Sequence, residues 1–177
     1  MAKSNNSGHA AVVGILMGSD TDLAVMTEAA KTLEKFGISY EMEVISAHRS
    51  PARTHEYAGS ARERGLKVII VGAGGAAHLA GVVASLTTLP VIGVPLATTA
   101  LNGLDALLST VQMPAGIPVA TVALDKAGAV NAAILAAQIL GTSNADIGRK
   151  LLVHKEELAR SVEEKNAKLK APVAGPK

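Results

Sequence analysis

Side chains that can bind an anion and move a proton stand together in the segment SAHRSP. Ser46 offers a hydroxyl, His48 an imidazole that exchanges protons near neutral pH, and Arg49 a planar, permanent positive charge suited to phosphate or carboxylate. Ser50 and Pro51 have the residue types that favour an N-cap and the first position of a helix. The segment therefore predicts either an ordinary helix start with solvated neighbours or part of an active site.

Two further segments carry polar side chains in the same kind of place, directly after an apolar run and before a helical pattern. They are MGSDTD, which contains Ser19 and Asp22, and GAGGAAHLAG, which contains His78. In a parallel sheet the carboxyl ends of the strands share one edge, and helices that begin there direct free N–H groups and positive dipole ends toward a ligand. Together, the three segments predict an anion-binding site at that edge.

Simpler interpretations of these residues remain open. Ser19 or Asp20 could act only as an N-cap, with Asp22 as an acid favoured in the first turn of a helix. The glycines of GAGGAAHLAG could serve only the turn and helix packing, although their density favours the approach of a ligand. His78 could be a buried histidine with satisfied hydrogen bonds. The other histidines are expected to be structural or solvated: His9, His55 and His154.

The rest of the chain alternates short β-branched runs with longer helical patterns. Strands are predicted at 12–17, 40–45, 67–72, 90–95 and 117–124. Helical patterns separate them, and Gly37 and Gly65 are typical residues for helix ends. Strands that alternate with helices in this way are parallel and covered on both faces. The pattern predicts an α/β fold, a flavodoxin-like three-layer αβα sandwich with a five-stranded parallel sheet and a C-terminal helical extension.

Composition divides the chain into a flexible N-terminal tail over 1–10, a single α/β catalytic domain over 11–142, and a C-terminal helix and tail over 143–177. Residues 66–124 contain only two charged side chains, so the body has excess apolar surface. The C-terminal helix carries an apolar stripe, formed by Ile147, Leu151, Leu158, Val162 and Leu169. We expect a homo-oligomer in which this helix packs on a neighbouring subunit. The alternative is a tail folded back on its own subunit.

The composition argues against several classes of protein. The chain has 177 residues and no Cys, so it forms neither disulfides nor a thiolate metal site. A net charge of +2, one Phe, two Tyr and no Trp argue against nucleic acid binding. Residues 1–10 lack the apolar core of a signal peptide, and the uncharged run 68–104 is broken by glycines and prolines, so no membrane-spanning helix fits. We expect a soluble cytoplasmic protein with no nucleic acid or membrane partner.

Common nucleotide and hydrolase motifs are absent or incomplete. There is no Gly-Lys-Ser/Thr ending for a P-loop and no G-x-S-x-G for a serine hydrolase. GAGGAA fits the dinucleotide pattern G-x-G-x-x-A, but no acidic residue stands between Glu63 and Asp105 to hold ribose hydroxyls. No His and acid stand at metal-ligand spacing, so we expect no bound metal.

Several motifs together resemble the class I N5-carboxyaminoimidazole ribonucleotide mutases of purine biosynthesis, the PurE family. They are MGSDTD, VISAHRSP, GAGGAAHLAG, LPVIGVP, NGLDALLSTVQMPAGIPVATVAL and GAVNAAILAAQILG, in order from Val12 to Gly141. The resemblance implies an isomerase that moves a carboxylate from the exocyclic nitrogen of aminoimidazole ribonucleotide to carbon 4 of the ring. It also implies no ATP, metal or organic cofactor, a ribonucleotide as the small-molecule partner, and a homo-octamer.

The resemblance also implies roles for individual residues. His48 would shuttle a proton between nitrogen and carbon, while the substrate loses carbon dioxide and recaptures it in the enclosed pocket. Ser19 and Asp22 would bind the phosphate and ribose side, and Ser46 and Arg49 would help to hold the phosphate. The wall around the base and the carbon dioxide would be formed by Gly74, Gly75, Ala76, His78 and Leu79.

Two departures and two alternative functions accompany this interpretation. The family has Thr where this chain has Ser50, and HLPGM where it has HLAGV, so that Ala80 in place of Pro loosens the loop after His78. One alternative is a class II carboxylase that uses free carbon dioxide, although GAGGAAHL resembles class I. The other is a nucleotide-binding module that has lost turnover. The presence of His48 argues against this second alternative.

Overall fold

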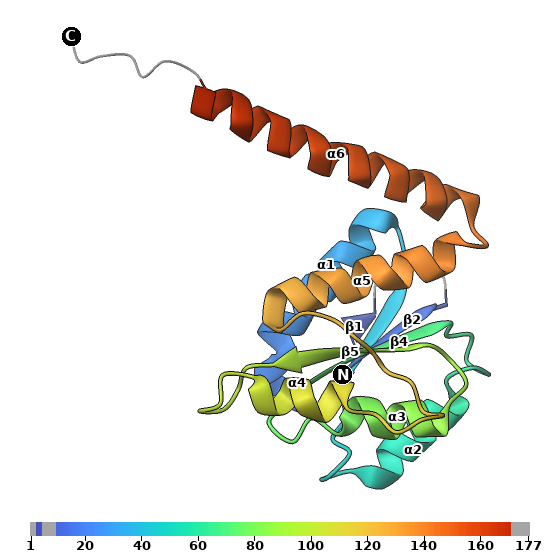
Figure 1. The fold of residues 1–177 in the computed structure, drawn as a ribbon. Coiled ribbons are helices and arrows are strands. Elements are labelled where there is room, and N and C mark those ends of the chain that lie inside the picture. Colours follow the sequence, from blue (N-terminus) through green and yellow to red (C-terminus); the bar gives the residue numbers. More distant parts are fainter. Residues whose placement is uncertain (1–2, 5–9, 171–177) are drawn as a thin grey trace.

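The computed structural model describes residues 3–4 and 10–170 (Figure 1). Most of the predicted N-terminal tail, and residues 171–177, therefore lie outside the described residues. The elements in chain order are β1 (Lys3–Ser4), β2 (Val13–Met17), η1 (Asp20–Asp22), α1 (Leu23–Phe36), β3 (Tyr40–Val44), α2 (Pro51–Ser60), β4 (Val68–Gly74), α3 (Leu79–Leu86), β5 (Val91–Leu96), α4 (Leu104–Val111), β6 (Ala120–Thr121), α5 (Asp125–Gly141) and α6 (Ala145–Lys170).

The strands form one sheet in the order β1-β3-β2-β4-β5-β6. The strands from β2 to β6 are parallel, and β2 pairs with β3 on one side and β4 on the other, so strand order reverses at β2. The predicted flavodoxin-like arrangement of five parallel strands is confirmed. β1 adds an antiparallel edge to β3, with Lys3 opposite Met42. The sequence does not predict β1, because two polar residues carry no apolar alternation.

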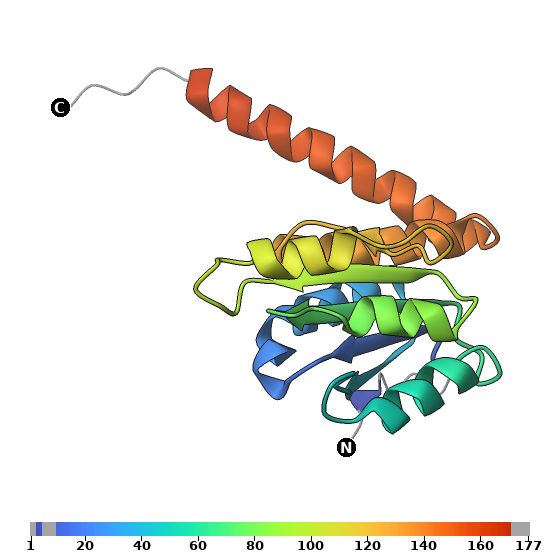
Figure 2. The ribbon, with the colours of Figure 1, turned by 60° about the horizontal axis from the view of Figure 1, so that its bottom comes forward.

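Helices cover both faces of the sheet and create two hydrophobic cores (Figures 1 and 2). α1 and α5 pack together on one face over Ile15 and Ile70, while α2, α3 and α4 cover the face that carries Leu16 and Ile69. Alternate residues of a strand point to opposite faces of the sheet. Because helices cover both faces, all four side chains are fully buried. The carboxyl ends of β2 to β5 therefore lie at an edge of the sheet, between the helices of one face and the helices of the other.

The end of α1 agrees with the sequence pattern, whereas the last strand is shorter than the predicted 117–124. Gly37 ends α1 with a left-handed φ of 70°, as predicted. β6 covers only Ala120–Thr121, since Pro118 has no N–H for the ladder and the strand lies at the sheet edge. α3 begins at Leu79, because Gly75 has a φ of 59° and a turn separates it from the helix.

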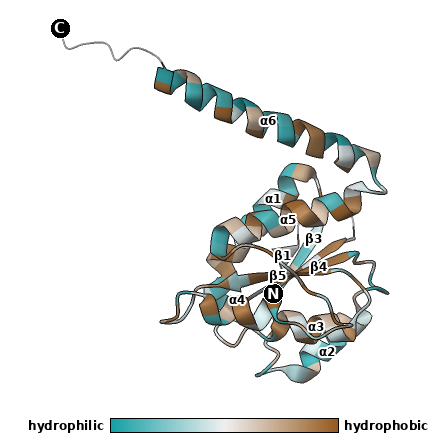
Figure 3. Cartoon of the chain, in the orientation of Figure 1, coloured by the Kyte–Doolittle hydropathy of each residue, from teal (hydrophilic) through white to brown (hydrophobic). Residues whose placement is uncertain are grey.

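α6 leaves the body of the molecule soon after it begins. Ile147 and Leu151 pack against the α1–α5 core, and Lys150 Nζ donates a hydrogen bond of 2.7 Å to the Phe36 carbonyl. Beyond this contact the helix projects away (Figures 1 and 2), with hydrophobic residues exposed among hydrophilic ones (Figure 3). No helix in the described part of the chain is both long enough and apolar enough to cross a membrane.

Candidate active site

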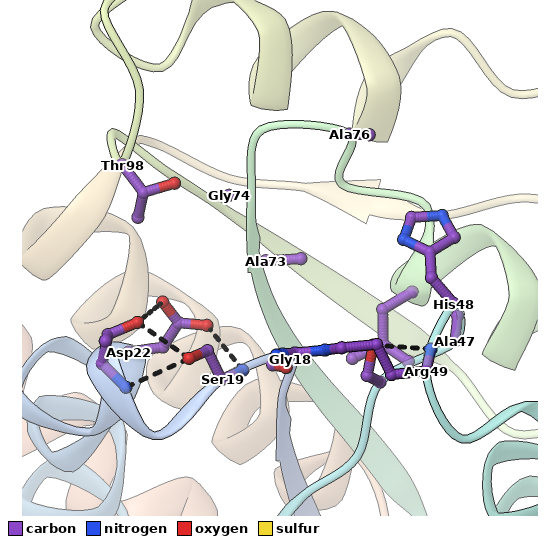
Figure 4. A pocket seen from close by; sticks show the side chains of 13 residues that line it. Gly18, Ser19, Asp22, Ala47, His48, Arg49, Ala73, Gly74, Ala76 and Thr98 are labelled. Carbon is purple, nitrogen blue, oxygen red and sulfur yellow. Dashed lines mark hydrogen bonds between the residues drawn. The ribbon is translucent and has the colours of Figure 1, made fainter.

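A cavity of about 410 Å³ lies at the carboxyl ends of β2, β3, β4 and β5 (Figure 4). Its walls come from the three polar segments that the sequence singles out, together with Thr98 after β5. Most of the residues expected at the site line it: Ser19, Asp22, Ser46, His48, Arg49, Gly74, Ala76 and Leu79. Gly75 and His78 do not line it, although His78 contacts His48 directly.

Ser19 and Asp22 form a capping box on η1, the short turn that leads into α1. The Ser19 N–H donates to Asp22 Oδ2 over 3.1 Å, and the Thr21 N–H donates to Ser19 Oγ over 3.4 Å. The cap interpretation of these residues is therefore correct, and the same bonds fix both side chains at the cavity. Asp22 is only 5% exposed, and burial raises the pKa of its carboxyl above the usual 3.8, while the bond from Ser19 lowers it.

The turn after β3 holds Ser46 and Arg49 in one arrangement. Arg49 Nη2 donates to the Gly18 carbonyl over 2.7 Å, and the Arg49 backbone N–H and Nε donate to Ser46 Oγ over 3.2 and 3.4 Å. The guanidinium therefore reaches from the β3 turn to the β2 turn (Figure 4). Because η1 and α2 also begin here, this part of the cavity suits an anion.

Ser50 holds the predicted N-cap position before Pro51, but its side chain makes no bond to cap α2. Instead, Ser50 Oγ donates to the Ser46 carbonyl over 2.9 Å and accepts from the Ser46 N–H over 3.1 Å. These two bonds close the turn that carries His48. The hydroxyl at position 50 therefore stabilises the site rather than the helix.

The glycines after β4 make room for other side chains of the protein. A Cβ at Gly72 would collide with the sulfur of Met26, and a Cβ at Gly74 would collide with the Thr98 side chain. Gly75 has the positive φ that its turn requires. The close-packing interpretation is therefore correct at Gly72, whereas Gly74 allows Thr98 to reach the cavity.

His48 and His78 face each other beside the cavity. His48 Nε2 lies 2.9 Å from His78 Nδ1, and the rings meet edge to face with centroids 5.0 Å apart. One of the two nitrogens must carry the proton between them. Both residues are exposed, so the alternative of a buried, satisfied His78 is wrong. His55 is exposed and His154 packs in the α1–α6 contact, while His9 lies outside the described residues.

Thr98 is the lining residue that the sequence reasoning missed. It follows β5, whose carboxyl end lies beside that of β4 at the same sheet edge. The signal was present, since a threonine-rich turn directly follows the predicted strand PVIGVP. The other unassigned lining residues belong to the three segments already singled out: Gly18, Thr21, Ala47 and Ala73.

The cavity combines anion-binding groups, the imidazole of His48 and an apolar wall, and His78 contacts His48 beside it. Ala73, Gly74, Ala76 and Leu79 form that wall without a charged side chain. In the described ranges, no three His, Asp or Glu side chains gather closely enough to share a metal ion. This arrangement can bind an anionic ligand, exclude water from part of it and move a proton on it.

Comparison with known families decides where the chain belongs. The family model for AIR carboxylase matches residues 12–161. The chain belongs to the AIR carboxylase family. The matched range contains all the motifs on which the resemblance was based, so the expected membership is confirmed, and the chain is an enzyme of this family.

Relatives within the AIR carboxylase family agree in sequence and in fold. The N5-carboxyaminoimidazole ribonucleotide mutase of Pyrococcus horikoshii is 61% identical over 89% of this chain and 88% of its own length. That of Bacillus subtilis is 55% identical over 89% of this chain and 98% of its own length. The crystal structure of Treponema denticola PurE matches with a TM-score of 0.78 at 29% identity, covering 90% of this chain and 98% of that one.

Proposed function

We propose that this protein is an N5-carboxyaminoimidazole ribonucleotide mutase, an isomerase of purine biosynthesis. The names of relatives at 55%, 61% and 64% identity support the proposal. The observation that carries it is the placement of His48 and Arg49, from one turn, on a cavity that also has an apolar wall. The site thus combines His48 as a proton carrier, Arg49 as an anion-binding group and a surface that excludes water.

The phosphate of the substrate binds at Arg49 in this proposal. Nη2 of Arg49 is engaged with the Gly18 carbonyl, whereas Nη1 has no hydrogen-bond partner among the described residues. Ser19 and Ser46 add hydroxyl groups nearby, and the start of α2 adds positive potential. Asp22 then faces the ribose, where a carboxylate can accept bonds from hydroxyl groups.

The reaction proceeds by loss and recapture of carbon dioxide. The bond between the exocyclic nitrogen and the carboxylate breaks, carbon dioxide leaves, and the electron pair left on nitrogen takes up a proton. Carbon 4 of the ring then attacks the carbon dioxide, and the product forms when carbon 4 loses its proton. His48 carries the proton between the two positions. Substrate and product are isomers, so the step is balanced without an oxidant, a reductant or ATP.

The apolar wall has a specific purpose in this scheme. Carbon dioxide that reaches water is hydrated or lost, so the pocket must enclose it between the two steps. Ala73, Gly74, Ala76 and Leu79 supply small or apolar contacts for this. His78 is the partner of His48 in the free protein, and the substrate must displace it from Nε2 before that nitrogen can act.

Turnover with two substrates tests the proposal against its alternatives. The purified protein should isomerise N5-carboxyaminoimidazole ribonucleotide directly, without added bicarbonate. Turnover of aminoimidazole ribonucleotide in bicarbonate, with none of the N5-carboxy compound, would instead establish a class II carboxylase. Binding of the ribonucleotide with turnover of neither substrate would establish a nucleotide-binding module.

We also propose that the protein is a homo-oligomer, an octamer in keeping with the resemblance to the PurE family, and that α6 packs on a neighbouring subunit. α6 has 26 residues, about 39 Å at 1.5 Å per residue, and none of them is buried. Val162 and Leu169 are 66% and 85% exposed. Long helices in water depend on packing of their apolar face, and a second copy of the chain can provide it. α4 exposes another apolar row that such a copy could cover: Leu104, Leu108 and Val111.

A further inference from the structure

Thr98 is the only polar side chain on one wall of the cavity, among the described residues that line it. The rest of that wall comes from β4 and the segment after it. Its residues are Ala73, Gly74, Ala76 and Leu79, and none of them has a side-chain donor or acceptor. Ligand pockets are largely apolar, and the few polar groups in them fix the orientation of the ligand. A single hydroxyl on such a wall is therefore well placed for recognition.

The chain on either side of Thr98 is anchored. The Ala97 N–H donates to Asp125 Oδ1 over 2.9 Å, which ties the end of β5 to the start of α5. Thr99 Oγ1 donates to Asp105 Oδ2 over 2.6 Å, which ties the following residue to the first turn of α4. The position of Thr98 is thus set by bonds that do not involve its own side chain.

The Thr98 side chain lies over the end of β4 because position 74 is a glycine. A Cβ there would collide with both Oγ1 and Cγ2 of Thr98. Within the described residues, no hydrogen bond engages Thr98 Oγ1, whereas Thr21, the other threonine on the cavity, bonds to Ser19 Oγ over 3.0 Å. A hydroxyl that is held in place and unpaired is available to a ligand.

The location of Thr98 indicates which part of a ribonucleotide it would meet. Figure 4 shows Thr98 and Asp22 on one side of the cavity, and His48 and the turn that carries Arg49 on the other. In the proposed function, Arg49 holds the phosphate and His48 acts on the imidazole. The ribose joins those two groups, so its hydroxyls are directed away from both, toward Asp22 and Thr98.

We propose that Thr98 is a specificity-determining residue that binds the ribose hydroxyls of the substrate together with Asp22. The Asp22 carboxylate accepts hydrogen bonds, and the Thr98 hydroxyl can both accept and donate, which suits two neighbouring hydroxyl groups. The inference rests on the proposed function, because it takes the ligand to be a ribonucleotide. It assigns the loop after β5 to the binding site.

Binding of aminoimidazole ribonucleotide to Thr98→Val tests this inference, since this compound lacks the carboxylate and cannot isomerise. Val has nearly the shape of Thr without the hydroxyl. We expect titration calorimetry to show about a tenfold loss of affinity, as for one hydrogen bond, and no loss for the 2′,3′-dideoxy analogue. Thr98→Ser should bind as the unsubstituted protein does. Thr142→Val is the matched control, because the Thr142 hydroxyl bonds to the Ile139 carbonyl at the end of α5 and Thr142 does not line the cavity.

Equal affinity of Thr98→Val and the unsubstituted protein for the ribonucleotide would overturn the inference, and so would equal losses for the two ligands. Thermal unfolding checks that each variant is folded, and Thr98→Ala gives the same comparison if Thr98→Val does not fold. Failure of the proposed function is distinguishable, because the unsubstituted protein would then bind the ribonucleotide but not isomerise its N5-carboxy form.

Discussion

His48 Nε2 and His78 Nδ1 lie 2.9 Å apart in the free protein. A ring nitrogen of His48 that could exchange a proton with the substrate is therefore already paired. In the proposed mechanism, substrate binding breaks this bond before that nitrogen acts, and His78 takes no part in the proton transfer itself. The two histidines touch each other, yet they should respond very differently to substitution.

Replacement of His48 by Ala should lower the isomerisation rate by roughly 100- to 10,000-fold, the range for loss of a general acid–base group. The affinity of His48→Ala for aminoimidazole ribonucleotide should stay within about threefold of that of the unsubstituted protein, because Arg49 and Asp22 remain. His78→Ala should keep kcat within about fivefold, since His78 only pairs with the resting imidazole. Steady-state kinetics and calorimetry measure both. A His48→Ala protein that isomerises at nearly the full rate would show the mechanism to be wrong.

Arg49 should dominate binding of the phosphate. Arg49→Met keeps much of the side-chain length but removes the charge, and we expect KM to rise about 10- to 100-fold, as for a charged hydrogen-bonded contact. The dependence of KM on salt should weaken in the same variant, because the screened attraction is gone. Arg49→Lys should recover the salt dependence but only part of the affinity, since a single ammonium cannot reach both Gly18 and Ser46. An unchanged KM in Arg49→Met would place the phosphate elsewhere.

Gly72→Ala and Gly74→Ala should separate stability from binding. Each adds a methyl group that collides with a neighbour, Met26 or Thr98, so each should lower the free energy of unfolding by about 1–3 kcal/mol. Only Gly74→Ala displaces Thr98, and only that variant should also bind aminoimidazole ribonucleotide more weakly. Urea unfolding and calorimetry measure the two effects. Equal binding by the two variants would contradict this distinction.

Asp22 should make folding stability depend on pH in a defined direction. Burial raises its pKa above 3.8, so the folded state binds more protons than the unfolded state in that range. The favourable contribution of the protonated carboxyl is therefore present at low pH and lost as pH rises through the raised pKa. Asp22→Asn abolishes this titration and keeps an oxygen that can accept the Ser19 N–H.

Relative to the unsubstituted protein, Asp22→Asn should gain stability as pH rises from below 3.8 through the raised pKa of Asp22. Urea unfolding at a series of pH values measures the difference. The same variant should bind aminoimidazole ribonucleotide more weakly, since the amide has one acceptor oxygen in place of two. A stability difference that is constant with pH, or that falls as pH rises, would contradict the assigned burial of the carboxyl.

Val162 should belong to an interface between subunits. Val162→Asp places a charge on the exposed apolar stripe of α6 and should lower the oligomer mass measured by light scattering. Arg160→Asp, two residues earlier on the same helix, faces roughly the opposite side and is the control. If Val162→Asp and the unsubstituted protein have the same mass at every concentration, this face of α6 is not an interface.

The sequence predicts the sheet and the meeting of three turns because both depend on local pattern and on a general rule of parallel folds. Buried runs such as residues 13–17 define the strands, and the carboxyl ends of parallel strands share an edge. The sequence therefore predicts the hydroxyl of Ser19 and the charge of Arg49 at one site, and both residues line the cavity.

The remaining features depend on contacts between residues far apart in the chain. His48 and His78 are 30 residues apart, and neither segment alone indicates that the rings meet. Gly74 is a glycine because Thr98 packs against it, which no local pattern shows. Ser50 looks like a helix cap in sequence, but its hydroxyl has two partners on Ser46 that compete with the cap.

In the proposed mechanism, one enclosed carbon dioxide molecule is released and recaptured beside His48. N5-carboxyaminoimidazole ribonucleotide with a carbon-13 carboxylate, turned over in a large excess of unlabelled bicarbonate, tests this claim most directly. Mass spectrometry of the product formed in the first turnovers should show the label retained, and His48→Ala should form the product at least about 100-fold more slowly. A product whose carboxylate carries no label, at the full enzymatic rate, would contradict the account.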